Sequence, residues 1–437
     1  MALRRLNRRQ VLALGAASLA SSLGARAQAP KSMRIGLVVP TRTGPGQVVS
    51  SMYEAVGEAA RMGAILAGDE IGQNAELMGR ELKVLLASAP TAEAATRSAQ
   101  RLIATEKVFA LVGGLGPGQA RALSQVAEQR KVLFFNIGDP APALRAEACS
   151  RYTFHVEASA AMYLDALADW FVRSSFRRWF FVYPKTPEGQ GLYQRMIKAL
   201  TVRHWGAREA GKATVAASQP DYSREIQSIR ASGADVVMLL LNGEDQLAFL
   251  GQYESLGLSV PITAFPDPIT QTRDFYSALR LAAPKTSAGY RATLWEATLD
   301  AYGARELNAR FSERWGQVMD PSAWAAYESV KMLFEAASFG QTLEPSKLVA
   351  YLEKPQTVFD VHKGIGVSFR PWDHQLRQTL YLVKLNAQAQ ASVELSKRRA
   401  MAALVGELPA IYRPGTDPIE RLDQLGDLKG DTRCRFK

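Results

Sequence analysis

Residues 106–144, EKVFALVGGLGPGQARALSQVAEQRKVLFFNIGDPAPAL, decide the fold class. Residues 108–112 are a short apolar run typical of a buried strand, and residues 113–118 then hold four glycines. Apolar side chains recur at helical spacing over 119–129, and a second apolar run follows at 132–137. Strand, Gly-rich loop, helix and strand in this order predict a parallel α/β sheet.

The loops after these two strands are the first candidate ligand site. Ligands of open parallel sheets bind in the crevice outside the carboxyl ends of the strands. Glycines let a ligand approach the backbone, and the following helix directs free N–H groups at it. The alternative is that the glycines only form a tight turn. Neither a dinucleotide fingerprint nor a P-loop is present. The candidates are Gly114, Gly116, Gly118, Gln119, Gly138 and Asp139.

The N-terminus has the pattern of an export signal. Arginines precede a modest apolar run at 11–23, which is far short of the roughly 20 residues that span a membrane. Small-x-small cleavage motifs follow, and residues 7–12, NRRQVL, resemble a twin-arginine signal. We expect residues 1–27 to be removed and the protein to be periplasmic. The alternative is an ordinary amphipathic helix.

The composition is that of a globular protein of two to three domains, with 437 residues, 47% hydrophobic and 22% charged. The net charge of +11 falls to +6 without the signal, which contains five arginines and no acidic residue. No basic stripe with interleaved aromatics is present, so nucleic-acid binding is not expected. No second apolar run reaches membrane length, so no membrane insertion is expected.

Cys149 and Cys434 are the only cysteines of the chain. In an oxidising periplasm they can form one disulfide, which would tie the C-terminal tail to the body of the protein. The alternative is two unpaired thiols.

Strand and helix patterns alternate through most of the chain, in one series before about residue 150 and a second series after it. This alternation predicts two parallel α/β units. Residues 388–437 lose the pattern and read as a surface tail, with a helix expected over 393–404. Outside 106–144, the predicted strands are 33–40, 82–87, 152–156, 179–183, 235–241, 262–265, 288–293, 366–370 and 379–385.

Over residues 33–385 the chain resembles the type I periplasmic binding proteins of branched-chain amino acid ABC transporters, the leucine/isoleucine/valine-binding family. The resemblance rests on the order of short motifs, which are TGP at 43–45, LVGG at 111–114, NIGDPAP at 136–142, EGQGL at 188–192, FPD at 265–267 and DHQ at 373–375. Residues 372–378, WDHQLRQ, resemble a subgroup associated with pyrroloquinoline-quinone-dependent alcohol dehydrogenase systems.

The resemblance implies two α/β lobes that close by a hinge on a small-molecule ligand and deliver it to an ABC permease. The chain is expected to cross between the lobes near 150, 267–272 and 354–364. The first lobe would comprise 33–150 with 272–354, and the second lobe 151–267 with 364–386. Residues 387–437 would be the tail.

Two departures from the family concern the ligand carboxylate. Amino-acid binders of the family hold it with hydroxyls in the first loop and a threonine after the next strand, because a carboxylate needs donors. Here the first loop, 114–119, has no hydroxyl, and Pro140 stands where the threonine would be. Proline has neither a hydroxyl nor an N–H, so the usual carboxylate anchor is missing.

Acidic residues instead gather on the loops expected to face the cleft. Asp267 stands where the family keeps an acidic group for a ligand ammonium, and Glu188 where an aromatic covers the ligand. The alternative is that these side chains face solvent or cap helices. Converging carboxylates would require a cation, either an ammonium group or a hard metal ion. The acidic set comprises Asp139, Glu188, Glu244, Asp245 and Asp267.

The chemistry of an enzyme is not visible in the sequence. Ser124, Ser159 and Ser223 lack the Gly-x-Ser-x-Gly context of a nucleophile elbow. The four histidines are scattered without metal-ligand spacing, and no cofactor is expected. We therefore predict a binding protein of an ABC transporter, whose ligand is not an ordinary branched-chain amino acid. A periplasmic sensor or accessory protein of an alcohol-oxidation system is the alternative.

Overall fold

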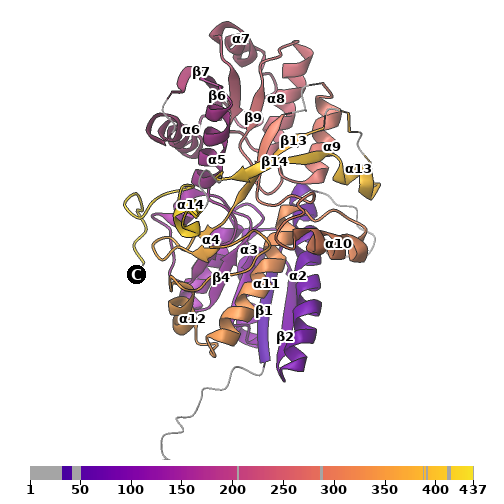
Figure 1. Cartoon of the computed structure of the whole chain (residues 1–437), viewed down its shortest axis with the longest axis vertical. Coiled ribbons are helices and arrows are strands. Elements are labelled where there is room, and N and C mark those ends of the chain that lie inside the picture. The colour runs from indigo at the N-terminus through magenta and orange to yellow at the C-terminus, as the bar shows by residue number, and fades with distance from the viewer. Residues whose placement is uncertain are drawn as a thin grey trace, which may run out of the picture.

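The computed structural model describes residues 32–41, 51–203, 206–285, 289–386, 388–389, 392–410 and 415–436. It has two α/β lobes stacked along its long axis (Figure 1). The predicted signal at 1–27 and most of the first loop, including the TGP motif at 43–45, lie outside the described residues. In the part of the chain that is described, no helix has both the length and the hydropathy of a membrane span.

The first lobe is built on a five-stranded parallel sheet of order β2-β1-β3-β4-β5. Its strands β3 and β4 are entirely buried, as their largely apolar sequences predict. Helix α11 (Pro321–Phe339) packs along α2 (Met52–Leu77) in this lobe. The remaining elements are β1 (Ser32–Val39), β2 (Glu81–Ser88), α3 (Ala92–Arg101), β3 (Ala110–Gly113), α4 (Gln119–Arg130), β4 (Leu133–Asn136), β5 (Thr153–His155), α10 (Ala304–Trp315) and α12 (Pro345–Leu352).

The second lobe has a four-stranded parallel sheet of order β7-β6-β8-β9 and a three-stranded antiparallel sheet of order β10-β13-β14. Its elements are α5 (Ala160–Arg173), β6 (Arg178–Pro184), α6 (Pro187–Lys198), β7 (Arg208–Val215), α7 (Ser223–Ser232), β8 (Val236–Leu239), α8 (Gly243–Ser255), β9 (Ile262–Ala264), α9 (Arg273–Ala282), β10 (Tyr290–Thr293), β13 (Leu380–Leu385) and β14 (Ala402–Leu408).

The lobe boundaries differ from those expected from the sequence. Helix α9 packs on α8, and β10 pairs with β13, so we place 273–293 in the second lobe rather than the first. The hairpin of β11 (Ser368–Phe369) and β12 (Leu376–Arg377) adjoins the first sheet, where Gln375 bridges to His155. Strand and helix alternation does not show which sheet a strand joins, and this explains the difference.

The tail is more regular than the sequence pattern indicates. The helix expected over 393–404 is short, α13 (Leu395–Arg399), and the chain then forms β14 at the edge of the second lobe. A further short helix, α14 (Pro418–Leu422), follows. In Figure 1 the yellow tail runs from β14 in one lobe to the junction between the lobes, where the C-terminus lies.

Candidate functional site

Loops at the carboxyl ends of both parallel sheets border a cavity of about 440 Å³. The first lobe contributes residues 139–143, which follow β4, and the second lobe contributes the first turns of α6 together with Phe265, which follows β9. Prolines, alanines, a leucine and a phenylalanine form most of the wall. Asp139, Glu147 and Glu188 are its acidic residues, and Arg433 from the tail is its basic residue.

Asp139 is held at the cavity by the side chain of Asn136. The Asn136 Oδ1 accepts from the N–H of Asp139 at 3.0 Å, and its Nδ2 donates to the Asp139 carbonyl at 2.8 Å. The Asp139 Oδ1 accepts from the N–H of Ala141 at 2.8 Å. Burial raises the pKa of the Asp139 carboxyl. This carboxyl therefore lines the cleft in a fixed orientation.

Glu188 lies opposite, in the first turn of α6, and its side chain is exposed. The turn begins at Thr186, whose hydroxyl accepts from the N–H of Gly189 at 3.1 Å. A carboxylate in the first turn is also stabilised by the helix dipole. Glu188 thus stabilises the start of α6 and also lines the cavity.

Asp267 forms the turn that follows β9. Its Oδ1 accepts from the N–H groups of Ile269 at 2.9 Å and Thr270 at 2.8 Å, and burial raises its pKa. One carboxylate oxygen is therefore used by the backbone. Asp267 is not among the residues that line the cavity, although its neighbour Phe265 is.

Tyr53, in the first turn of α2, is affected by the charge of several members of the acidic set. Burial raises the pKa of its hydroxyl, and the charges of Asp267, Glu244 and Asp139 raise it further. Three loops from two lobes thus act on one phenol. Tyr53 is not among the residues predicted from the sequence, where the one signal for it is its place just after the loop that follows β1.

Asp245 does not take part in this site. It is buried and accepts from the Tyr222 hydroxyl at 3.1 Å and from the N–H of Ser218 at 3.0 Å. Glu244, its neighbour, is exposed at the start of α8. Among the residues that the structure describes, no group of three or more His, Cys, Asp or Glu side chains could hold a metal ion.

The Gly-rich loop is mainly a packing device. Gly114 has φ 97° and Gly118 has φ 68°, conformations that favour glycine. The buried Gln119 accepts from the N–H of Gly116 at 3.3 Å and donates to the Ala89 carbonyl at 2.6 Å. The sequence predicts that Gly116 and Gln119 donate hydrogen bonds to a ligand. In the structure the Gly116 N–H and the Gln119 side-chain amide already donate to groups inside the first lobe.

Gly138 allows the two loops of the first sheet to touch. A Cβ at this position would lie 2.7 Å from the Cα of Leu115, which no side chain could tolerate without movement. Gly138 is itself buried and is not among the residues that line the cavity. Its role in ligand binding is therefore indirect, through the position of Asp139.

Behind the cavity, buried polar side chains join the lobes. Glu157 accepts from the Tyr163 hydroxyl at 2.7 Å, and burial raises its pKa to about 7. The Tyr163 hydroxyl is also within 3.1 Å of Gln271 Nε2. Lys363 is buried and donates to Gln378 at 2.7 Å. Glu157, Gln271 and Lys363 lie on segments that connect the lobes along the chain, where a hinge would act, and Tyr163 lies in α5 of the second lobe.

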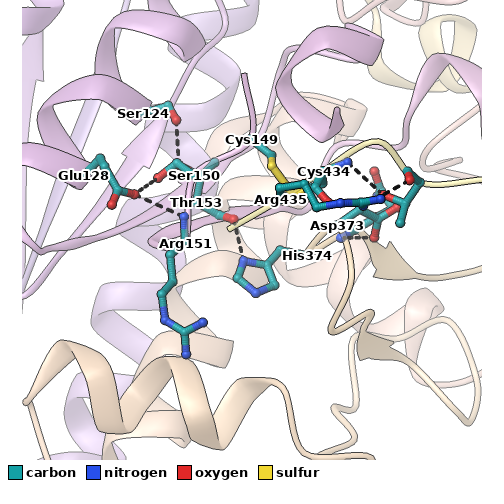
Figure 2. The surroundings of a disulfide bond; sticks show 12 residues. Ser124, Glu128, Cys149, Ser150, Arg151, Thr153, Asp373, His374, Cys434 and Arg435 are labelled. Carbon is teal, nitrogen blue, oxygen red and sulfur yellow. Dashed lines mark hydrogen bonds between the residues drawn. A yellow bond between two sulfur atoms is a disulfide. The ribbon is translucent and has the colours of Figure 1, made fainter. Parts of the chain in front are cut away.

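The two cysteines form a disulfide, which is one of the two alternatives that the sequence left open. Cys149, just before β5, and Cys434, in the tail, form a disulfide with 5.7 Å between the Cα atoms. Figure 2 shows this bond beside Ser150, whose hydroxyl donates to Glu128 at 2.6 Å. The tail is therefore covalently attached to the first lobe.

Two parallel-sheet lobes, a cavity between their loops and a polar junction behind it define a two-lobed ligand-binding protein. The chain belongs to the periplasmic binding protein family, whose model matches residues 32–390. This family binds ligands and is not one of enzymes. A comparison with curated proteins finds no match.

Solved structures share the fold at low identity. A branched-chain amino acid ABC transporter periplasmic ligand-binding protein from Burkholderia xenovorans is 17% identical with a TM-score of 0.73, over 86% of this chain and 95% of that one. A leucine-binding protein from Thermotoga maritima is 14% identical with a TM-score of 0.68, over 86% and 98%. A solute-binding protein of an ABC transporter from R. palustris, in complex with benzoate, is 18% identical with a TM-score of 0.65, over 86% and 96%.

Proposed function

We propose that this protein is the periplasmic substrate-binding component of an ABC transporter, which captures a small ligand by hinge closure and presents it to a permease. The cavity between loops of both lobes carries this proposal, because a ligand there would contact both lobes and favour their closure. The names of the similar solved structures support the same role. Export by the predicted signal at 1–27 would bring the protein to the periplasm.

The ligand we propose has an apolar body and a neutral or cationic polar group. The apolar wall includes Pro140, Leu192 and Phe265, while Asp139 and Glu188 bring negative charge to the same cavity. The R. palustris protein binds benzoate, an anion. An anion would be repelled by these carboxylates unless it paired with Arg433, so we do not expect benzoate to be the best ligand here.

The test is mass spectrometry of the small molecule that copurifies with the native protein, followed by calorimetry of that compound with ligand-stripped protein. Binding at micromolar or lower Kd of a neutral or cationic compound would support the proposal. Turnover of the compound, or a tight-binding anion, would contradict it.

The narrower resemblance to binding proteins of alcohol-oxidation systems remains a proposal that rests on residues 372–378. Side chains of this segment take part in the lobe junction. Gln375 bonds to Arg145, His374 stacks on Phe154 with ring centroids 4.1 Å apart, and Arg377 bonds to Asp423 at 2.8 Å. These internal contacts give residues 372–378 a structural role that does not involve an alcohol. The role as a sensor or accessory protein of an alcohol-oxidation system is therefore the second candidate.

A further inference from the structure

The tail beyond β14 contacts the two lobes in turn. Asp423 first accepts from Arg370 and Arg377, both at 2.8 Å, on the hairpin that adjoins the first sheet. The N–H of Gly426 then donates to Asp165 of α5 at 2.8 Å, in the second lobe. Cys434 finally returns to the first lobe through the disulfide with Cys149.

Between Gly426 and Cys434 the tail lies on α6 of the second lobe. Asp427 pairs with Arg195 at 3.4 Å, and Asp431 pairs with Lys198 at 3.1 Å. Arg195 is nearly buried and is also paired with the fully buried Asp165 at 2.7 Å. The contact with the second lobe therefore has a buried ionic centre, as well as the exposed pair at Lys198.

The same segment borders the cavity. Arg433 lines it and lies 3.6 Å from Glu147, while α6 supplies the facing wall. The link between the lobes is therefore on the cavity side of the molecule, where the lobes would separate to admit a ligand.

We propose that residues 426–434 are a tether that limits the separation of the lobes and favours the closed cleft. An extended chain spans about 3.3–3.6 Å per residue. Cys434 is three residues after Asp431, so with the Lys198 pair intact the tether spans at most about 11 Å. If the pairs on α6 break but Gly426 stays on α5, eight residues span at most about 29 Å.

The separation of the lobes should depend on the redox state of the disulfide. Reduction of the disulfide removes the covalent attachment of the tether to the first lobe. The Arg433–Glu147 pair at 3.6 Å and the bonds of Asp423 with the hairpin still contact that lobe, but they can exchange with water. The inference rests on the proposed hinge closure, because a tether matters only to lobes that move. It concerns the spacing of the lobes and needs no knowledge of the ligand.

The test is small-angle X-ray scattering on ligand-stripped, full-length mature protein. Cys149→Ser with Cys434→Ser removes the covalent end, and Asp427→Asn with Asp431→Asn weakens the contact with α6 but keeps the disulfide. Asp274→Asn is the matched control, because it removes the pair with Arg398 at 2.7 Å, which joins the tail to α9 on the second lobe without bridging the lobes through the tether.

Both double variants should have a larger radius of gyration than the wild type, and Asp274→Asn should not. If the cysteine variant fails to fold, reduction of the folded wild type tests the same end of the tether. An unchanged radius of gyration in the aspartate variant and after reduction would overturn the proposal. Because no ligand is present, failure to bind a transport substrate would affect only the proposed function.

Discussion

Arg145 donates from its Nε to the Oε1 of Gln375 at 2.6 Å, although 230 residues separate them in the chain. The same guanidinium donates to the carbonyls of Asp139 at 3.0 Å, Ala141 at 3.2 Å and Glu157 at 2.8 Å. Arg145 is buried, so one side chain holds the cavity loop, the first crossing of the chain and the hairpin in one arrangement.

Arg145→Ala should therefore destabilise the protein by about 3 kcal/mol or more, since buried acceptors lose charged donors. Arg145→Lys should recover only part of this loss, because an ammonium cannot reproduce the planar fork of the guanidinium. Unfolding in urea measures both. A loss below about 0.5 kcal/mol for the alanine variant, typical of surface substitutions, would contradict the role.

Asp267→Asn should weaken binding of the copurified ligand at least tenfold, while Glu244→Gln should change it less than twofold. Asparagine keeps the oxygen that caps the turn at Ile269 and Thr270, so the fold should survive while the charge is lost. One charge-assisted hydrogen bond contributes about 1.5–3 kcal/mol. Calorimetry compares the two variants, and equal affinity of Asp267→Asn and wild type would be the contrary result.

Leucine, isoleucine and valine should bind poorly. Pro140 offers no donor, and the Gly116 N–H is already bonded to Gln119. Two missing charge-assisted hydrogen bonds correspond to an affinity lower by about a hundredfold or more. Titration of ligand-stripped protein with each amino acid measures this. Micromolar or tighter binding of leucine would show that the cleft anchors a carboxylate by other groups.

Glu157 should make stability depend on pH. Burial raises the pKa of its carboxyl in the folded protein to about 7, above the ordinary value of 4.5, so the folded state holds the proton more tightly. This contribution is fully present below pH 4.5 and is lost as the pH rises through 7.

The wild type should accordingly lose roughly 2–3 kcal/mol more than Glu157→Gln between pH 5 and 8. Glutamine can still accept from the Tyr163 hydroxyl, which makes it the suitable comparison. Asp320 and Glu335, whose pKa values burial raises to about 6 and about 7, titrate in both proteins and cancel in the difference. Parallel pH curves for the two proteins would exclude the effect.

Removal of the Cys149–Cys434 bond should lower the unfolding free energy by about 5 kcal/mol in the chain-entropy model, because it closes a loop with a sequence separation of 285. Denaturant unfolding of the double serine variant measures the loss. Thiol titration of unfolded, unreduced wild type should find no free thiol, and two reactive thiols would show that the bond does not form.

Local apolar patterns were sufficient to predict the architecture. Residues 106–144 form β3, α4 and β4 at the expected places, because buried parallel strands and amphipathic helices have distinct periodicities. The family resemblance then predicted the arrangement in two lobes. It did not predict the lobe boundaries correctly, because β10 pairs with β13, which lies far along the chain.

The candidate site was less predictable. Asp139 and Glu188 line the cavity, as loops at strand ends should, whereas Asp245 is used in internal hydrogen bonds. Arg433 reaches the cavity from the tail, and the charges of Asp139 and Asp267 act on Tyr53 of α2. Such contacts depend on tertiary packing, and no local spacing in the sequence indicates them.

The packing of α11 on α2 also constrains the order in which the protein can fold during synthesis. The first sheet is complete at β5, but α11 is made only after the whole of residues 160–293. The second lobe, which is continuous apart from β13 and β14, can therefore collapse while apolar surface of the first lobe still lacks its cover. During synthesis the first lobe, although translated earlier, would therefore be less completely folded than the second lobe. At that stage its exposed apolar surface would make it more prone to aggregation.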